Sequence, residues 1–257
     1  MRYSIRRGVQ ICKSFLKRSA LIVGVWRALQ GGLRDVRVMS WTLARKHKIN
    51  SYLKGNQLKK LHLGANNSSL PGWLNSNVLP TDRSMVYLDA TQRFPMNDNA
   101  FDYIMAEHMI EHIAYDDAVK MLRECHRVLK PGGRIRVATP DLEVLIGLHS
   151  VEKTDSQKQY IEWIVNECKL ATAICKDVFV INNAFRAWGH CFLYDRETLK
   201  ATMEAAGFVY ATFHKPGDSE DPSLKGVESH GKTTSEEINQ FESFVVEAEC
   251  QKGSSVK

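Results

Sequence analysis

Short apolar segments alternate with helical patterns along most of this chain of 257 residues, and this alternation restricts the fold more than any other feature. Strands that are separated by helices pair in parallel, and the helices then cover both faces of the sheet. We expect strands at about 60–64, 73–78, 85–89, 101–105 and 134–139, and two more near 207–213 and 241–249. The sequence therefore predicts an α/β domain with a doubly wound, mostly parallel seven-stranded sheet in three layers, α/β/α.

Two helices of this domain have clear boundary signals. The first begins near Tyr115, carries acidic residues in its first turn and ends before Pro131-Gly132. The second follows Asp195, a good N-cap residue, and stops at Gly207. Between them, residues 143–190 have the pattern of a helical insertion of the kind that covers an active site. Residues 214–240 are rich in Gly, Ser, Asp and Lys and are expected to form a loop.

Basic charge is concentrated in the first part of the chain. Residues 1–60 hold fifteen Lys and Arg and one acid, Asp35, whereas the whole chain has a net charge of +6. Apolar residues at steps of three and four predict a basic amphipathic helix over 1–27, and Gly31-Gly32 breaks this pattern. We therefore divide the chain into a basic helical extension, 1–56, and a domain, 57–257.

Such an extension either packs on the domain or lies on an anionic surface, such as acidic lipid headgroups. A transit peptide or a weak signal peptide are further interpretations of an Arg-rich, acid-poor segment. The longest apolar run, 20–26, is far shorter than the ~20 residues that cross a bilayer. The six cysteines form no C-x-x-C pair, which favours a reducing compartment. We expect a cytoplasmic protein that can be peripheral to the inner membrane face through residues 1–56.

Motifs at the ends of the predicted strands follow one another in a fixed order. They are Leu63-Gly64-Ala65, the segment 72–77, Leu88-Asp89-Ala90, the segment 94–102 and Lys130-Pro131-Gly132-Gly133. In order and spacing they resemble the class I S-adenosylmethionine-dependent methyltransferases, and within them small methyltransferase-11-type proteins of bacterial surface-glycan synthesis. The resemblance covers about 58–213. It implies a Rossmann-like sheet, S-adenosyl-L-methionine as cofactor and methyl transfer as the reaction.

The first edge of the cofactor site is expected just after the first strand, because ligands of open parallel sheets bind at the carboxyl ends of the strands. Gly64 allows a close approach of the backbone, and the amides of Ala65 and Asn66 can bind a carboxylate. Asn66 stands where the family usually has a second glycine, and Asn tolerates the left-handed conformation.

The resemblance assigns the rest of the cofactor site. The family's Gly-Trp-x-Asn-x-Asp ends in an acid that binds the ribose, and this chain has Asn77 there. An amide oxygen still accepts a hydrogen bond, but without the contribution of a charge. Asp89 and Ala90 correspond to the pair that contacts adenine, and His108 corresponds to a residue on the cofactor side. Asp102 is expected to be structural, at the start of its strand.

On the acceptor side, the resemblance makes Glu111-His112 part of the floor of the site. His190 can take a proton from an acceptor hydroxyl, because histidine titrates near neutrality. Trp188 and Tyr194 offer stacking surface for a sugar, unless this aromatic cluster is core. Glu228 and His230 are lesser candidates, and a purely structural role of His112 is the alternative. We predict no metal site, because H-E-x-x-H is absent and no third ligand is evident.

The function expected from this combination is methyl transfer to an oxygen of a glycan or lipid-linked sugar, with His112 and His190 as catalytic residues. The alternative is a binding or regulatory module whose pocket is weakened at Asn66 and Asn77. Nucleic acid is not favoured as a partner, because aromatic and basic residues are not interleaved. A nicotinamide dehydrogenase is disfavoured, because G-A-N-N-S-S replaces the G-x-G-x-x-G fingerprint. The sequence does not predict an oligomeric state.

Overall fold

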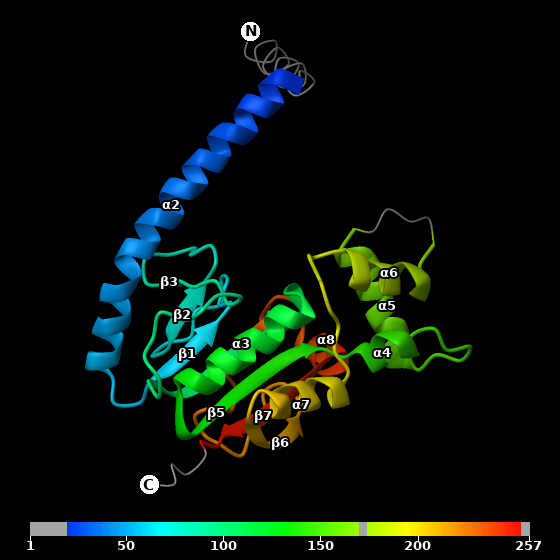
Figure 1. Cartoon of the computed structure of the whole chain (residues 1–257). Helices are drawn as coiled ribbons and strands as arrows, with labels where there is room; N and C mark the ends of the chain where they lie inside the picture. Colours follow the sequence, from blue (N-terminus) through cyan, green and yellow to red (C-terminus); the bar gives the residue numbers. More distant parts are fainter. Residues whose placement is uncertain (1–19, 170–173, 253–257) are drawn as a thin grey trace. The chain divides into compact units, whose positions relative to one another are not determined.

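The structure, a computed structural model (Figure 1), describes residues 20–169 and 174–252. The chain divides into two compact units, 1–47 and 48–257. Helix α2 (Ala20–Gly55) belongs to both, because its last two turns pack in the second unit. None of the described helices combines the length and apolar character that a bilayer-spanning segment needs.

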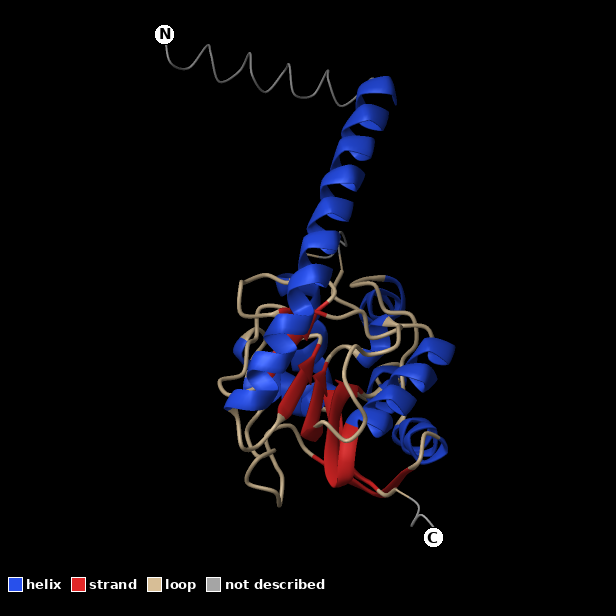
Figure 2. Ribbon diagram, turned by 60° about the vertical axis from the view of Figure 1, so that its left-hand side comes forward, coloured by secondary structure: helices blue, strands red, loops and turns tan. Residues whose placement is uncertain are grey.

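A seven-stranded sheet forms the centre of the second unit (Figure 2). Its strands are β1 (Lys60–Leu63), β2 (Leu74–Asn77), β3 (Val86–Tyr87), β4 (Phe101–Glu107), β5 (Leu129–Pro140), β6 (Phe208–His214) and β7 (Ser243–Cys250). Their order is β3-β2-β1-β4-β5-β7-β6, and only β7 runs antiparallel to its neighbours. The winding therefore reverses between β1 and β4. The predicted fold class is confirmed.

Helices pack on one face of the sheet and bury the main apolar core. They are the end of α2, α3 (Tyr115–Val128) and α7 (Arg196–Ala205). In β4, Ile104 and Ala106 point into this core, where they meet Met121 and Leu122 of α3 and Ile49 of α2. Full burial of one such aliphatic side chain stabilises the fold by about 1.5–3 kcal/mol. This face holds strands β1 and β4 in place beneath the site.

The opposite face is covered mainly by the segment that follows β6, together with α8 (Glu236–Glu242) and a short 3₁₀ turn, η2 (His230–Lys232). Met105 of β4 packs there against Trp73 and Leu224. Arg136 of β5 is fully buried on this face.

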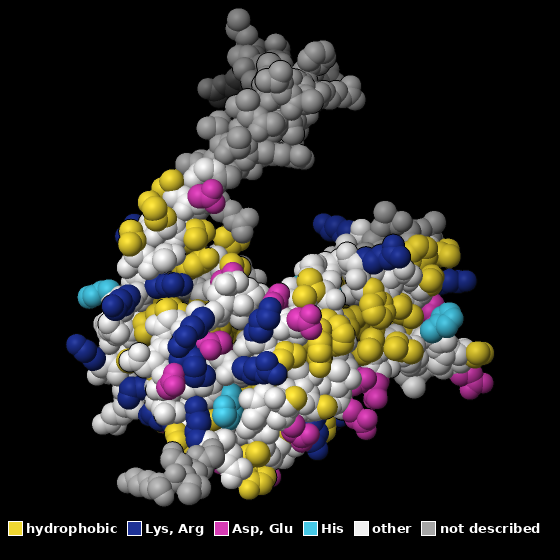
Figure 3. Space-filling view, viewed as in Figure 1, with side chains coloured by type: hydrophobic (Ala, Val, Ile, Leu, Met, Phe, Trp, Pro, Cys, Tyr) yellow, Lys and Arg dark blue, Asp and Glu magenta, His cyan; other side chains and the backbone are white. Residues whose placement is uncertain are grey.

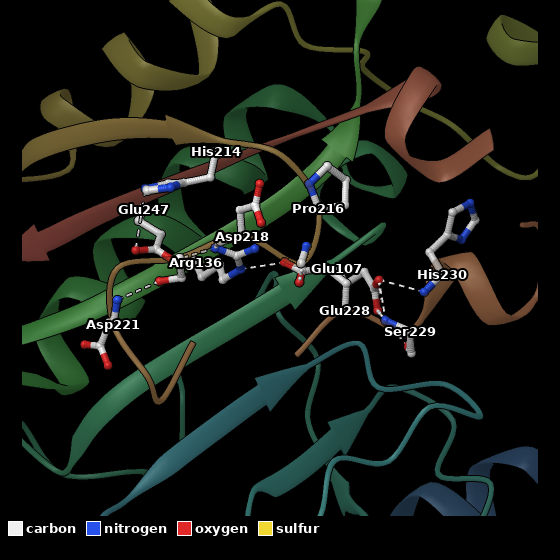
Figure 4. A network of polar contacts seen from close by, with 12 residues as sticks. Glu107, Arg136, His214, Pro216, Asp218, Asp221, Glu228, Ser229, His230 and Glu247 are labelled. Atoms are coloured by element: carbon white, nitrogen blue, oxygen red, sulfur yellow. Dashed lines mark hydrogen bonds and ion pairs between the residues drawn. The ribbon is translucent and has the colours of Figure 1, made fainter. Parts of the chain in front are cut away.

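The Arg136 guanidinium forms ion pairs with Glu228 and Glu247, and it donates to the carbonyl oxygen of Asp218 at 2.8 Å (Figure 4). Two carboxylates around one buried guanidinium compensate its desolvation. Glu228, a lesser candidate for the site, is thus a structural partner of Arg136.

The sequence placed several element boundaries differently from the structure. The prediction that Gly31-Gly32 interrupts the N-terminal helix is wrong, because α2 continues through both glycines; a glycine costs about 1 kcal/mol in a helix without ending it. Residues 1–19 of that predicted helix lie outside the described residues. Strand β5 begins at Leu129, before Pro131-Gly132. The predicted loop 214–240 contains η2 and most of α8.

The segment 143–190 contains three helices in its described part: α4 (Leu142–Gly147), α5 (Asp155–Glu167) and α6 (Asp177–Arg186). They share a small apolar core of their own, in which Leu148, Ile164 and Val180 are buried. Thr154 caps α5 in a reciprocal capping box with Gln157. The five described cysteines are free.

Candidate cofactor and acceptor site

A cavity of about 550 Å³ opens at the carboxyl ends of β1, β2 and β4, next to the point where the winding reverses. It is lined by residues from the loops after these strands: Gly64, Asn66, Asn77, Val78, Leu79, Thr81, Leu88, Asp89, Ala90, His108, Met109, His112 and Ile113. This is the position at which open parallel sheets bind ligands. Seven of the nine site residues expected from the sequence line it.

The other two lie beside it. Ala65 is buried and borders a smaller adjacent cavity of about 170 Å³, which also contacts Glu107 and His230. His190 stands behind His112, and the centres of the two imidazole rings are 5.0 Å apart.

The turn after β1 exposes backbone to the cavity. Gly64 has φ +66° and Asn66 has φ +43°, both in the left-handed region. The Ala65 amide donates to the carbonyl oxygen of Ser76 at 2.9 Å, so it does not face a ligand carboxylate as the sequence led us to expect. The Thr81 hydroxyl donates to the carbonyl oxygen of Asn66 at 2.8 Å. A Cβ added at Gly64 would collide with the side chain of Met109. The turn therefore requires glycine at 64 both for its dihedral angle and for space.

At the end of β3, the carboxylate of Asp89 is held by its own turn. Its Oδ1 accepts from the amide of Thr91 at 3.0 Å and from the Thr91 hydroxyl at 2.7 Å. Leu88 donates its amide to the carbonyl oxygen of Asn77 at 3.1 Å, which keeps the β2 and β3 ends together. An oriented acid next to the small Ala90 suits the edge of an adenine ring, and the cradle at Gly64 suits the amino-acid end of the same cofactor. The residues present thus fit S-adenosylmethionine.

His108 and Glu111 form a buried ion pair between the cavity and the strand ends. His108 Nδ1 lies 3.3 Å from Glu111 Oε1, and His108 Nε2 is 2.9 Å from Ser243 Oγ. Burial would by itself lower the pKa of His108, but the Glu111 carboxylate beside it raises that pKa overall. In the same way, His108 lowers the pKa of Glu111 against the effect of burial. His108 is held at φ +45°, an uncommon conformation for a residue with a side chain.

The segment that carries His190 is tied to the short helix η1 (Ile110–His112). The amides of Cys191 and Phe192 both donate to the carbonyl oxygen of Glu111, at 2.7 and 3.2 Å. His190 Nδ1 donates to the carbonyl oxygen of Ala184 at 2.7 Å, so Nε2 is the nitrogen with a free lone pair. Burial lowers the pKa of His190, which favours its neutral form. His112 is exposed at the rim of the cavity.

The burial of Tyr194 and Trp188 tests the expectation that they stack on a sugar, and the hydrogen bonds of Asp102 test its expected structural role. Tyr194 cannot stack on a sugar, because it is fully buried and packs against Phe192 and Tyr115; the core interpretation holds for it. Trp188, in contrast, is half exposed. Asp102 is structural as predicted: it accepts from the Lys59 amide at 2.8 Å and from Lys130 Nζ at 2.7 Å.

The sequence analysis did not predict the contacts between the end of β4 and the segment between β6 and α8. Glu107 accepts from the amides of Ser229 and His230 at 2.8 Å each (Figure 4). The ring of His230 stacks on that of His108, with 3.8 Å between the ring centres. More than 120 residues separate these partners, so no local pattern signals the contact. Met109, which packs against Gly64, was also missed, since a single methionine after a strand carries no motif.

The chain matches a family model described as a methyltransferase domain over residues 73–137. It is 29% identical over 126 residues to the ubiquinone/menaquinone biosynthesis C-methyltransferase UbiE of Vibrio cholerae. That match covers 48% of this chain and 43% of the relative, so the chain spans less than half of the relative's length.

Solved structures similar to the chain include an S-adenosylmethionine-dependent methyltransferase of Thermotoga maritima described as a possible histamine N-methyltransferase. It is 16% identical, with a TM-score of 0.45, over 88% of this chain and 100% of that chain. Another is a methyltransferase from Archaeoglobus fulgidus, 15% identical with a TM-score of 0.42, over 82% and 93% of the two chains. The matched family model and the curated relative are both those of methyltransferases, and the strand order of the sheet agrees with the fold expected for a class I S-adenosylmethionine-dependent methyltransferase.

Proposed function

We propose that this protein transfers a methyl group from S-adenosylmethionine to a hydroxyl oxygen of a glycan or lipid-linked sugar. The proposal is supported by a pair of imidazoles: His112 lines the cofactor cavity, and the ring centre of His190 is 5.0 Å from that of His112. A neutral imidazole beside an acceptor hydroxyl is the group that a methyl transfer to oxygen needs. The cofactor supplies the activated methyl group on its sulfonium centre.

The cofactor-side residues have separate tasks in this proposal. The turn at Gly64 and Asn66 binds the amino-acid end, and Asn77 accepts a hydrogen bond from the ribose. Asp89 accepts a hydrogen bond from the adenine amino group, and the amide of Ala90 donates one to a ring nitrogen. His108 closes the cavity between them, where its ion pair with Glu111 keeps the ring in one orientation. Positioning of this kind supplies much of the rate enhancement in a direct displacement.

On the acceptor side, His190 is the better base. Its Nδ1 proton is engaged with Ala184, its pKa is lowered by burial, and its Nε2 is available to receive the acceptor's proton. His112, exposed at the rim, passes that proton to solvent. The half-exposed Trp188, whose ring centre is 5.5 Å from that of His190, offers a face on which a sugar ring can stack.

A lipid-linked acceptor also fits the basic first unit. In the described part of α2, Val36, Met39 and Leu43 lie at steps of three and four and are all strongly exposed. An apolar stripe on a helix with a basic surround is typical of a segment that lies on an anionic membrane. We infer that residues 1–56 hold the enzyme at the surface where such an acceptor resides.

A second candidate is a module that binds the cofactor without efficient catalysis. It is favoured by Asn77, which lacks the charge that strengthens a hydrogen bond to the ribose. The curated relative is a C-methyltransferase by name, so transfer to carbon is the competing chemistry for an active enzyme.

The experiment is incubation of the full chain with S-adenosylmethionine carrying a ¹³C methyl group and a lipid-linked glycan fraction. The ¹³C chemical shift of the transferred group distinguishes a methyl ether from a methyl on carbon. We expect a methyl ether signal that is lost in His190→Ala. A signal from methyl on carbon would overturn the assignment to oxygen, and absence of transfer by a protein that binds the cofactor would favour the binding module.

A further inference from the structure

We infer that Glu111, His112 and His190 form a binding site for a divalent transition-metal ion, best matched by zinc, at the acceptor end of the cofactor cavity. The site combines one carboxylate and two imidazoles. Their ligand atoms all lie within 4.8 Å of one another. Two histidines and one acid form a common ligand set for catalytic zinc and for iron(II), and imidazole ligands disfavour magnesium and calcium.

The buried carboxylate of Glu111 has one oxygen that the described residues leave without a hydrogen bond. Glu111 is fully buried, and its Oε2 accepts from the Thr139 hydroxyl at 3.1 Å. Its Oε1 lies within ion-pair distance of His108, at 3.3 Å, but accepts no hydrogen bond in the described part of the chain. Among the described residues, Oε1 is thus paired only with His108, without hydrogen-bond geometry. A carboxylate oxygen has more than one lone pair, so this oxygen can also bind a metal ion.

Two of the three ligands, His190 and Glu111, have hydrogen-bond partners of the kind that support metal ligands. Metal-bound histidines usually donate their second ring nitrogen to a carbonyl oxygen, which fixes the tautomer. His190 does this through Nδ1 and the carbonyl of Ala184. Ligating carboxylates are in turn hydrogen-bonded, as Glu111 is to Thr139.

The backbone holds the third ligand in place at some conformational cost. Trp188 has φ +58° and Gly189 has φ +81°, so two consecutive residues before His190 are left-handed. For a residue with a large side chain this conformation costs on the order of 1–3 kcal/mol and persists where the surroundings enforce it. Here the two hydrogen bonds from Cys191 and Phe192 to the carbonyl oxygen of Glu111 enforce it.

This site revises the expectation of no metal, which rested on the missing H-E-x-x-H order. The third ligand comes from beyond the helical insertion, and no spacing rule in the sequence connects it to Glu111. The role of the ion depends on the proposed function: where the ion is bound, His190 Nε2 is a ligand and not the base, and the ion would instead lower the pKa of an acceptor hydroxyl bound to it. Its binding does not depend on that function.

The test is calorimetric titration of the metal-free full chain with Zn²⁺. We expect one tightly bound equivalent, with at least a 100-fold loss of affinity in His112→Ala and in His190→Ala. Thr139→Val removes only the outer hydrogen bond and is expected to cost roughly 10-fold. The control is His149→Ala, which deletes an exposed imidazole paired with Asp177 on the helical insertion and is expected to change nothing. His112 is exposed, so its replacement leaves the core intact even if a Glu111→Gln variant fails to fold.

Three results would overturn the inference: no binding of Zn²⁺, an affinity of the His112→Ala and His190→Ala variants equal to that of the unmodified protein, or a thiolate charge-transfer band with Co²⁺ that places the ion on a cysteine such as Cys191. A parallel titration with S-adenosylhomocysteine separates this inference from the proposed function. Cofactor binding without zinc binding refutes the metal site alone. Zinc binding without cofactor binding supports the metal site and refutes the methyltransferase proposal.

Discussion

Asn77 is the residue at which the affinity for the cofactor can be adjusted. It lines the cavity at the end of β2, where an acid would make charge-assisted hydrogen bonds to ribose hydroxyls. We expect Asn77→Asp to tighten cofactor binding by on the order of 1 kcal/mol, roughly fivefold in Kd. The control is Asn97→Asp, which adds the same charge on an exposed loop outside the cavity. Equal or weaker binding in Asn77→Asp would remove Asn77 from the ribose site.

Gly64 is the residue on which the geometry of the cavity depends. An added Cβ would lie 2.9 Å from the Cβ of Met109 and still closer to its Cγ, so the wall of the cavity must move. We expect Gly64→Val to abolish cofactor binding, and even Gly64→Ala to weaken it severely.

Gly72 offers a matched control. It has φ +78°, so Gly72→Ala carries a similar left-handed penalty of roughly 1–2 kcal/mol, but open space surrounds the added Cβ. We expect thermal unfolding to show some loss of stability in both alanine variants, and calorimetry to show weakened cofactor binding only in Gly64→Ala. Normal affinity in Gly64→Ala would contradict the assignment of the turn after β1.

At the scale of elements, the parts of the fold with a strong local signal could be predicted from sequence. Helix α3 has a continuous apolar stripe and acidic first turn, and the sequence placed its start correctly at Tyr115. Strands β1, β2 and β4 begin within one residue of the expected positions. The prediction that Gly31-Gly32 ends a helix was wrong, because intrinsic helix propensity is a weak guide within a long helix.

Parts of the candidate site also have a local sequence signal, and other parts do not. The turn at Gly64 and the acid at Asp89 each have a short sequence signal, and both line the cavity. His112 contacts His190 about 80 residues further along the chain, and Glu107 contacts Ser229 about 120 residues further along. These contacts depend on how the helical insertion and the segment between β6 and α8 pack. No periodicity or motif contains that information.

Arg127 at the end of α3 connects two elements, and this connection can be measured. Its guanidinium donates to the carbonyl oxygens of Phe94 and Met96 and forms ion pairs with Glu124 and Asp98, which holds the segment before β4 against the helix. We expect Arg127→Met to destabilise the domain by roughly 1–3 kcal/mol in denaturant unfolding. Lys120→Met on the same helix removes only an exposed pair with Asp117 and is expected to change stability by less than about 0.5 kcal/mol.

The effect of Arg127→Met has a defined pH dependence. The hydrogen bond from Arg127 lowers the pKa of Glu124, so the stabilisation is fully present above the usual pKa of a glutamate and is lost as the pH falls through the lowered value. The difference between the two proteins should therefore shrink in acid. A difference that stays constant from neutral pH to the acid limit would mean that packing, and not the ion pair, accounts for the loss.

For the whole molecule, the two compact units predict a division of labour. Residues 1–47 contain eleven Lys and Arg and one Asp, whereas Ile49 and Tyr52 pack into the second unit. Deletion of 1–47, and not of 1–56, therefore removes the basic segment without opening the core. We expect the full chain to bind anionic vesicles with an affinity that falls steeply with salt, and the deletion to abolish this binding. Retained vesicle binding, or a loss of cofactor affinity on deletion, would contradict this division.

The surface charge of the second unit can be compared with that of the basic residues 1–47. Residues 48–257 contain 24 Lys and Arg and 28 Asp and Glu, and Figure 3 shows basic and acidic side chains on the same face of this unit. Mixed charges of this kind produce little long-range attraction. The salt-dependent part of vesicle binding should therefore follow the N-terminal residues alone.

Calorimetric titration with S-adenosylhomocysteine needs no acceptor and measures whether the cavity at the ends of β1, β2 and β4 binds the cofactor. We predict binding of one equivalent to the full chain, lost in Gly64→Val and retained in Gly72→Ala. The absence of binding to a protein that is folded by circular dichroism, or binding that Gly64→Val leaves unchanged, would contradict the assignment of this cavity.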